Sequence, residues 1–225
     1  MESRLLSDRS TAPLAAGFTL IEMLVVLAII IIISTIAFSS QGSFNKSIIL
    51  TNAAFDVALT IRNAETYGIS SRLNAGSVNT GYGVDFSHAL PNTFTLFADT
   101  APNPGTCHPH PNGATAPDAV PGDCAYGAGE KVVIYTLGNG ISVRDFCAYK
   151  ADGTKVCALG DALTSIDIVF SRPNPDAFIS TNGLYVTPPL AFVSACLTLV
   201  APQGGARYIS VAQSGSIVTS STPCP

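Results

Sequence analysis

The hydrophobic positions of this chain are concentrated in one uninterrupted block near its start. Residues 18–38 contain a single charged residue, Glu22. A helix rises about 1.5 Å per residue, so this block spans about 30 Å, the thickness of the hydrocarbon core of a bilayer. The block therefore predicts a helix long and apolar enough to cross a membrane.

The hydrophobic spacing becomes that of an amphipathic helix after a polar stretch, residues 39–47, which contains Gly42. One apolar stripe at helical steps consists of Phe44, Ile48, Phe55 and Leu59. An adjacent stripe consists of Val57, Ile61 and Ala64. We expect one face of this amphipathic half to be covered by a sheet, with Gly68 ending the helix. The prediction is one helix over residues 18–67, weakened near Gly42.

Short apolar runs separated by turn signals replace the helical spacing from residue 82 onward. The predicted strands are residues 82–86, 93–98, 131–137, 141–146, 155–158, 165–170, 190–199, 208–211 and 216–219. The turn signals are Asn139-Gly140, Asp152-Gly153, Asn182-Gly183 and Ser214-Gly215. Residues 99–129 are rich in Pro and Gly and predict a long loop.

Composition adds limits on function. The net charge is −4 and the chain has no basic cluster, so nothing indicates broad attraction to nucleic acid. No nucleophile elbow, zinc-protease helix or phosphate-binding glycine loop is present, so we expect no enzyme and no cofactor. Asp99 with Asn103, and Asp152 with Asp161, fall short of a calcium loop and are better read as turn residues.

All six cysteines follow residue 106: Cys107, Cys124, Cys147, Cys157, Cys196 and Cys224. An even number of cysteines in the part expected outside the membrane predicts three disulfides in an oxidising compartment. Six cysteines allow fifteen pairings, and the sequence does not choose among them. Our working pairing joins neighbours along the chain. The spacing of these cysteines and of His88, His108 and His110 matches no zinc pattern, so we expect no metal.

The polar residues before the apolar block allow three interpretations. In a secretory signal peptide the small residues follow an apolar segment of about 7–15 residues, whereas here Ala15, Ala16 and Gly17 precede a longer one. A plain membrane anchor fits the length of the block and leaves Glu22 unexplained. The third interpretation is a leader cut after Gly17, which places the apolar block at the new N-terminus.

The segment Gly17-Phe18-Thr19-Leu20-Ile21-Glu22 resembles the prepilin cleavage motif of the type IV pilin superfamily, which includes the pseudopilins of type II secretion. The resemblance implies that a membrane peptidase cuts after Gly17 and that Phe18 is then N-methylated. It also makes Glu22 the fifth residue of the mature chain. The leader lacks the net positive charge usual in the family, because Arg4 and Arg9 are balanced by Glu2 and Asp8.

The single charge of the block supports this interpretation on physical grounds. A carboxylate within an apolar helix costs about 2.5–3.5 kcal/mol on insertion scales, so Glu22 predicts a functional partner. Cleavage after Gly17 creates a charged amine at Phe18, and a neighbouring helix shifted along its axis can present this amine to Glu22. Such a contact compensates both charges and fixes the register of the helices. The alternative is that Glu22 extends to the lipid headgroups.

Four short stretches further resemble the globular domain of H-type pseudopilins and fimbrial-T-type minor pilins. They are residues 63–69, 81–86, 96–99 and 205–211. The resemblance implies an α+β fold of the type IV pilin kind, with a long N-terminal helix packed on antiparallel sheets. The expected organisation is a leader (residues 1–17), a transmembrane and assembly helix (18–38), its amphipathic continuation (39–72) and a β-rich domain (73–225).

We therefore expect a minor or initiating subunit of a type IV pilus or type II secretion pseudopilus. Its expected partners are other pilin subunits, the prepilin peptidase and N-methyltransferase, and membrane lipid before assembly. The expected location is the bacterial inner membrane, with the β-rich domain outside, and then the filament. One alternative is a single-pass membrane protein with an extracytoplasmic binding domain. The other is a DNA-binding minor pilin. The charge of the mature chain argues against it, because nine Lys and Arg are outnumbered by thirteen Asp and Glu.

Overall fold

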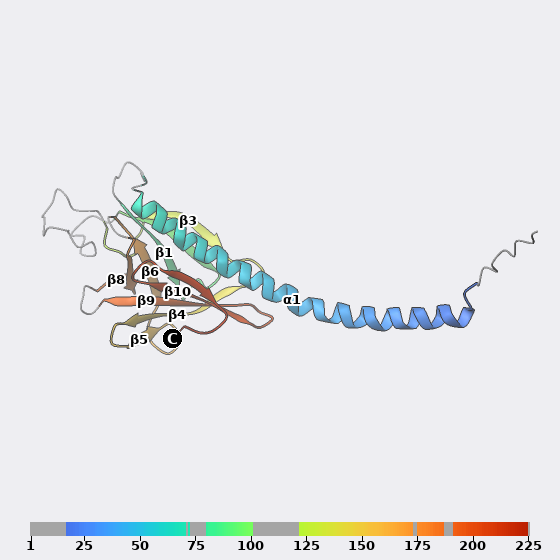
Figure 1. Cartoon of the computed structure of the whole chain (residues 1–225). Helices are drawn as coiled ribbons and strands as arrows, with labels where there is room; N and C mark the ends of the chain where they lie inside the picture. The colour runs from blue at the N-terminus through green and yellow to red at the C-terminus, as the bar shows by residue number, and fades with distance from the viewer. Residues whose placement is uncertain are drawn as a thin grey trace, which may run out of the picture. The chain divides into compact units, whose positions relative to one another are not determined.

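The computed structural model describes residues 17–70, 72, 80–100, 122–172, 175–186 and 191–224, with only the backbone of residues 39–45. One long helix, α1 (Leu20–Ile69), is followed by strands (Figure 1). The chain divides into two compact units, Met1–Phe44 and Asn45–Pro225, so α1 contributes to both. The predicted combination of a long N-terminal helix and antiparallel sheets is confirmed.

Two antiparallel sheets form the second unit (Figure 1). The six-stranded sheet has the order β3-β2-β1-β6-β7-β8, and the five-stranded sheet has the order β11-β10-β9-β4-β5. The strands are β1 (Gly81–Ser87), β2 (Thr93–Asp99), β3 (Lys131–Thr136), β4 (Ser142–Lys150), β5 (Lys155–Cys157), β6 (Ser165–Phe170), β7 (Ala177–Thr181), β8 (Leu184–Tyr185), β9 (Phe192–Val200), β10 (Ala206–Ala212) and β11 (Ile217–Ser220). Connections that change sheet, such as β3 to β4, interleave the two sheets along the sequence.

The second part of α1 and the inner faces of both sheets enclose one hydrophobic core. The helix contributes Leu50, Ala54, Val57, Ile61 and Ala64, all almost fully buried. Strand β1 contributes Tyr82, Val84 and Phe86, whose register partners on β6 belong to the same core. The five-stranded sheet adds Phe146, Leu197 and Ile209. The core therefore has three layers of contributors, one helical and two of sheet.

The structure decides which of the two apolar stripes of α1 faces the sheets. Ile48, Phe55 and Leu59 lie at the surface, with Phe55 56% exposed, and the side chain of Phe44 is outside the described residues. The buried stripe is the adjacent one, Val57, Ile61 and Ala64, extended by Leu50 and Ala54. Both stripes have helical spacing, so spacing alone could not choose. The buried stripe includes two alanines, and small side chains allow a helix to pack closely against a sheet.

Gly68 lies within α1, which ends at Ile69. A Cβ atom at this position would collide with the backbone carbonyl of Phe170 at the end of β6. The glycine is therefore required by a close approach of helix and strand. Its role is packing, whereas the sequence predicted a helix stop.

Sequence patterns missed β7 and β8. The run 177–181 is short and follows Pro175 and Asp176, so it resembles a continued turn. The turn after it was predicted, and Asn182 and Gly183 have φ values of 52° and 71°, the left-handed region that such pairs favour. The centre of the predicted long loop, with Asn103, Cys107, His108 and His110, lies outside the described residues.

Candidate functional site

The predicted cleavage point lies in an extended, exposed segment just before α1. Gly17 to Thr19 are outside the helix, and no atom lies within 4 Å of a Cβ built on Gly17. The helix begins at Leu20, two residues later than predicted. The bond between Gly17 and Phe18 therefore lies in exposed, non-helical backbone.

Thr19 fixes the start of the helix. Its Oγ1 accepts a hydrogen bond from the backbone N–H of Glu22 at 3.3 Å, and its carbonyl accepts one from Met23 at 3.2 Å. A Thr followed three residues later by Glu is the sequence signature of a capping box. The role of Thr19 was missed although this signature was present. Thr19 thus marks where the non-helical segment ends and α1 begins.

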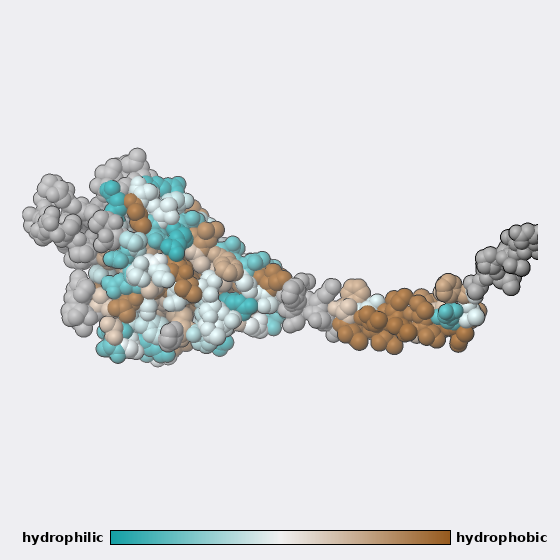
Figure 2. All heavy atoms as spheres, in the orientation of Figure 1, coloured by the Kyte–Doolittle hydropathy of each residue, from teal (hydrophilic) through white to brown (hydrophobic). Residues whose placement is uncertain are grey.

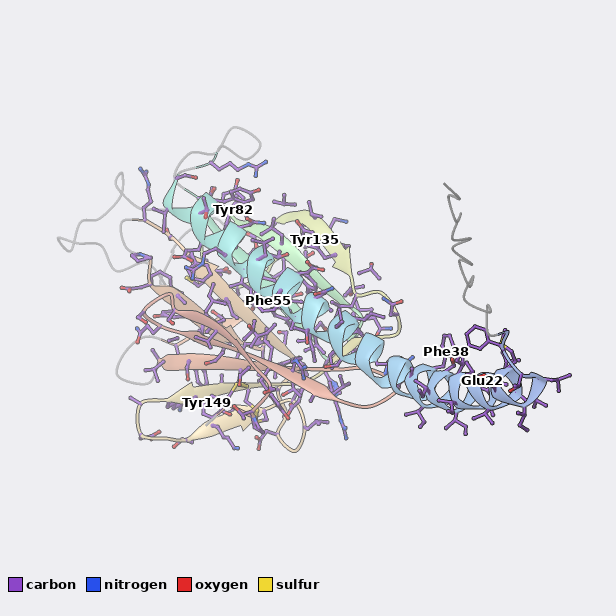
Figure 3. The ribbon with its side chains drawn as sticks, turned by 45° about the vertical axis from the view of Figure 1, so that its right-hand side comes forward. Glu22, Phe38, Phe55, Tyr82, Tyr135 and Tyr149 are labelled. Atoms are coloured by element: carbon purple, nitrogen blue, oxygen red, sulfur yellow. A yellow bond between two sulfur atoms is a disulfide. The ribbon has the colours of Figure 1, made fainter. Side chains whose placement is uncertain are left out.

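Glu22 lies exposed in the first turn of α1 (Figure 3). A carboxylate there is favoured by the partial positive charge of the helix N-terminus. In the described part of the chain an ion pair joins Arg62 and Glu65, and no cation lies beside Glu22.

The segment Leu20–Phe38 presents apolar side chains on every side. It is 19 residues long with a mean hydropathy of 2.9, and none of it is buried. Figure 2 shows these side chains as a continuous apolar surface. Soluble monomers rarely expose contiguous apolar patches larger than a few hundred Å², so this surface requires lipid or other helices around it.

Two disulfides close loops in the five-stranded sheet. Cys147 on β4 and Cys157 on β5 are register partners, with sulfur atoms 2.04 Å apart. Cys196 on β9 is joined to Cys224. Both are pairs of neighbours along the chain, as in our working pairing. Cys124 is also disulfide-bonded, while Cys107, its expected partner, lies outside the described residues.

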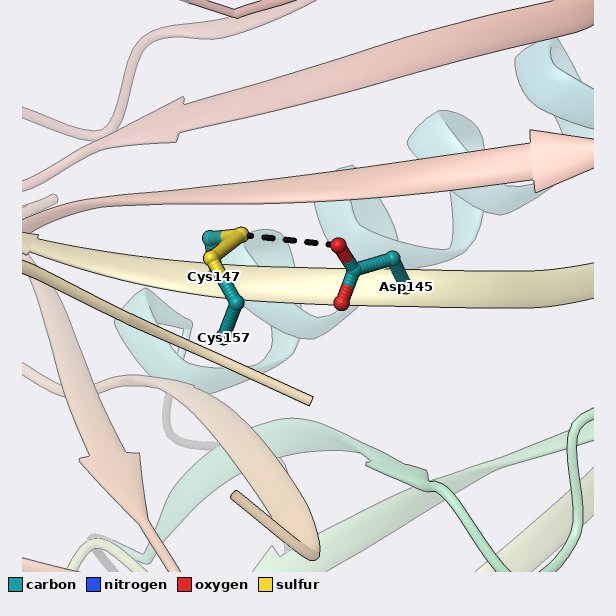
Figure 4. A group of neighbouring side chains, drawn as sticks. All are labelled: Asp145, Cys147 and Cys157. Atoms are coloured by element: carbon teal, nitrogen blue, oxygen red, sulfur yellow. Dashed lines mark hydrogen bonds between the residues drawn. A yellow bond between two sulfur atoms is a disulfide. The ribbon is translucent and has the colours of Figure 1, made fainter. Parts of the chain in front are cut away.

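Asp145 lies beside the first of these disulfides (Figure 4). One carboxylate oxygen is 3.8 Å from Cys147 Sγ, and the other accepts a hydrogen bond from the N–H of Leu159 at 2.9 Å. A metal site would need thiolates, and both sulfurs here are bonded to each other. The carboxylate instead holds the chain that leaves β5.

Arg207, one residue before the predicted strand 208–211, lies within β10 and connects it to α1. Its Nε donates to Thr51 Oγ1 and its Nη2 donates to Ser47 Oγ, each at 3.0 Å. The planar guanidinium can reach both hydroxyls at once. It thereby attaches the second part of α1 to the five-stranded sheet.

Comparison with known proteins gives one match. Residues 14–38 match the family model of the prokaryotic N-terminal methylation motif. No curated protein and no solved structure matches the chain. Proteins of the pilin-like methylation-motif family are structural subunits that assemble with other pilin subunits after cleavage by prepilin peptidase. The motif and the exposed apolar helix that follows it support a type IV pilin-like prepilin, processed at its N-terminus and suited to membrane anchoring.

Proposed function

We propose that this chain is a structural subunit of a type IV pilus or type II secretion pseudopilus. Prepilin peptidase cuts it after Gly17, Phe18 becomes the methylated N-terminus, and residues 18–38 enter the helix bundle of the filament. The observation that carries the proposal is the methylation motif together with an apolar span. No other described residue of the chain buries this span.

We further propose a minor or initiating role, with a domain of the H-type or fimbrial-T kind. The four short resemblances within the domain support it, as do the large β-rich unit and its disulfides. Before assembly the span lies in the inner membrane and the domain lies outside, where disulfides form. Residues 39–72 continue the helix into the domain that residues 73–225 complete.

Glu22 has the role of fixing register during assembly. In the bundle its carboxylate accepts a hydrogen bond from the terminal amine of a neighbouring Phe18, so the buried charges compensate one another. Burial against other helices then replaces contacts with lipid. The contact makes one axial shift between neighbours more stable than the others.

The test compares two substitutions that each remove one exposed carboxylate from α1. Glu22→Gln should leave cleavage intact and lower the amount of the subunit in sheared filaments about tenfold or more, because leaving a buried charge unpaired costs about 3–5 kcal/mol. The control, Asp56→Asn, lies on the second part of the helix and should be incorporated like the wild type. Normal incorporation of Glu22→Gln would show that the register argument is wrong.

A single-pass membrane protein with an extracytoplasmic binding domain is the rival proposal. It predicts that residues 1–17 remain attached and that the protein stays monomeric in the membrane. The N-terminus of the extracted protein distinguishes the two.

A further inference from the structure

A row of buried polar side chains crosses the outer face of the six-stranded sheet, the face that points away from α1. Its members are register partners on four successive strands. They are Thr95 on β2, Asp85 on β1, Asp167 on β6 and Ser180 on β7. None is more than 8% exposed, and Asp167 is only 1% exposed. Two carboxyl groups thus lie side by side in a place that water does not reach.

Asp85 and Asp167 are register partners on neighbouring strands, and each carboxyl group lies close enough to shift the pKa of the other. Ionised carboxylates only accept hydrogen bonds, so a hydrogen bond between the two needs a proton on one of them. Asp167 Oδ1 has no hydrogen-bond partner among the described residues. Burial raises the pKa of Asp85 to about 6, and burial together with the charge of Asp85 raises that of Asp167 well above its ordinary range.

Residues 122–130, here called the covering segment, lie over this row. The backbone N–H of Tyr126 lies near Asp167 and lowers the pKa of its carboxyl, and Ser180 Oγ donates a hydrogen bond to the carbonyl of Cys124. The N–H groups of Asp123 and Cys124 donate to Asp99 at the end of β2, each at 2.9 Å. The covering segment is therefore attached to β2 and β7, the strands on either side of the Asp85–Asp167 pair.

Apolar contacts surround the polar row and exclude water from it. Cys124 packs with Phe97 and Val169, and the rings of Tyr126 and Phe97 are 5.3 Å apart. These contacts exist only while the covering segment lies on the sheet. Displacing the segment would thus expose both the apolar cluster and the carboxyl pair.

The charged groups around the pair are acidic. The covering segment contributes Asp123 and Glu130, whose charges act on Asp167 and on Tyr126 respectively. Strand β2 contributes Asp99, and β7 contributes the uncharged Ser180. No Lys, Arg or His is among the described groups that shift the pKa of either carboxyl. Among the described groups that shift the pKa of the pair, none is a cation that would compensate a second negative charge.

A shared proton fits this site better than a metal ion. In the part of the chain that the structure describes, the group of three ligand atoms close enough to hold a metal is the one at Asp145 and its neighbouring disulfide. The backbone N–H of Tyr126 near Asp167 is a hydrogen-bond donor, whereas a cation there would need oxygen ligands. A proton satisfies both carboxyls with no further ligand.

We propose that the Asp85–Asp167 pair is a pH-sensitive attachment point for the covering segment. With one shared proton, the pair is neutralised enough to lie under the segment and to hold Tyr126. When the proton is lost, two adjacent carboxylates repel each other and attract water, and the segment separates from the sheet. This inference does not depend on processing at Gly17.

The direction of the pH effect follows from the raised pKa values of Asp85 and Asp167. A carboxyl whose folded-state pKa exceeds its ordinary value of 3.8 favours the folded state most below that value. This contribution is lost as the pH rises through the folded-state pKa, which for Asp85 is near 6. The attachment is thus firm in mild acid and weakens toward alkaline pH.

The experiment is hydrogen exchange on the full chain in detergent, with EDTA present, at a series of pH values from 5 to 8.5. Between pH 5 and pH 8.5, and after correction for the intrinsic exchange rate, protection of the Tyr126 and Cys124 amides should fall about tenfold or more. The comparison is with core amides such as Ile168. Asp167→Asn keeps a hydrogen bond to Asp85 without needing the proton, so its protection should be independent of pH. Asp56→Asn, an exposed acid on α1, should behave as the wild type.

If Asp167→Asn fails to fold, Asp85→Asn serves the same purpose from the other strand. Two results would overturn the proposal. One is that the Asn variant loses protection at Tyr126 and Cys124 with rising pH in the same way as the wild type. The other is recovery of Tyr126 protection at pH 8 on adding calcium chloride, in the wild type alone, which would make the pair a metal site.

Discussion

The two parts of α1 differ in whether their own chain buries their apolar side chains. In the second part, Leu50, Val57 and Ile61 are buried by the sheets of the same chain, and the opposite side of the helix carries polar residues such as Asn52 and Asp56. In the first part, Leu20–Phe38, no residue is buried and apolar side chains point in all directions. One helix therefore combines a part that its own domain completes with a part that other molecules must complete.

The comparison teaches that exposure has two meanings along this helix. Leu27 and Leu59 are 57% and 59% exposed, nearly the same fraction. Around Leu59 the neighbouring surface includes polar residues such as Asp56 as well as Phe55, and a few exposed apolar side chains among polar ones are ordinary. Around Leu27 every neighbour is apolar, which is tolerable in lipid or in a helix bundle. Matched substitutions in the two parts can separate these meanings.

The largest expected effect is on folding of the domain, from Ile61→Ala. Ile61 is fully buried, so truncation should lower the free energy of unfolding by about 2–5 kcal/mol through lost burial and a cavity. Leu59→Ala, two residues away on the exposed side, should change it by less than about 0.5 kcal/mol. Urea denaturation of the full chain in detergent measures both. Equal losses would mean that the assignment of the buried stripe is wrong.

A charge placed in the first part of α1 should reduce membrane association, whereas a charge in the second part should not. Leu27→Asp lies near the middle of the span and should cost about 2.5–3.5 kcal/mol of insertion free energy, moving the protein out of the membrane fraction. Leu59→Asp, at the same exposure, should leave membrane association unchanged. Alkaline extraction of membranes followed by immunoblotting distinguishes them. If both variants remained in the membrane, the span would not be the anchor.

The smallest expected effect concerns the attachment of the second part of α1 to β10. Arg207→Lys keeps the charge and loses the planar group that reaches Ser47 and Thr51 together. We expect a loss of about 0.5–1.5 kcal/mol in the free energy of unfolding. Arg144→Lys, at an exposed position on β4, is the control and should have no measurable effect. A loss of similar size in the control would indicate that charge geometry is not the cause.

Local patterns predicted what depends on neighbours along the chain. The apolar block, most of the strands and the Asn-Gly turns follow from spacing and from backbone preferences that act over a few residues. Thr19 was equally local, and its capping signature was overlooked. The strand Ala177–Thr181 was missed because it is short and follows a proline-rich turn.

Features that depend on distant contacts could not be read in the same way. The choice between the stripes of Phe55 and Ile61 depends on how closely a sheet can approach the helix. The Asp85–Asp167 pair depends on the register of two strands far apart in the sequence. Each aspartate is the one charged residue in its strand, which is a signal for one unusual position and not for the pair. Gly68 likewise has its role only because β6 passes beside it.

The central claim is that the first part of α1 becomes an assembly element by cleavage after Gly17. Intact-mass and N-terminal peptide analysis of the protein extracted from its native membrane tests it directly. The account predicts a chain that begins at Phe18 and carries one methyl group on the terminal amine. A chain that still begins at Met1 in cells with an active prepilin peptidase would contradict it.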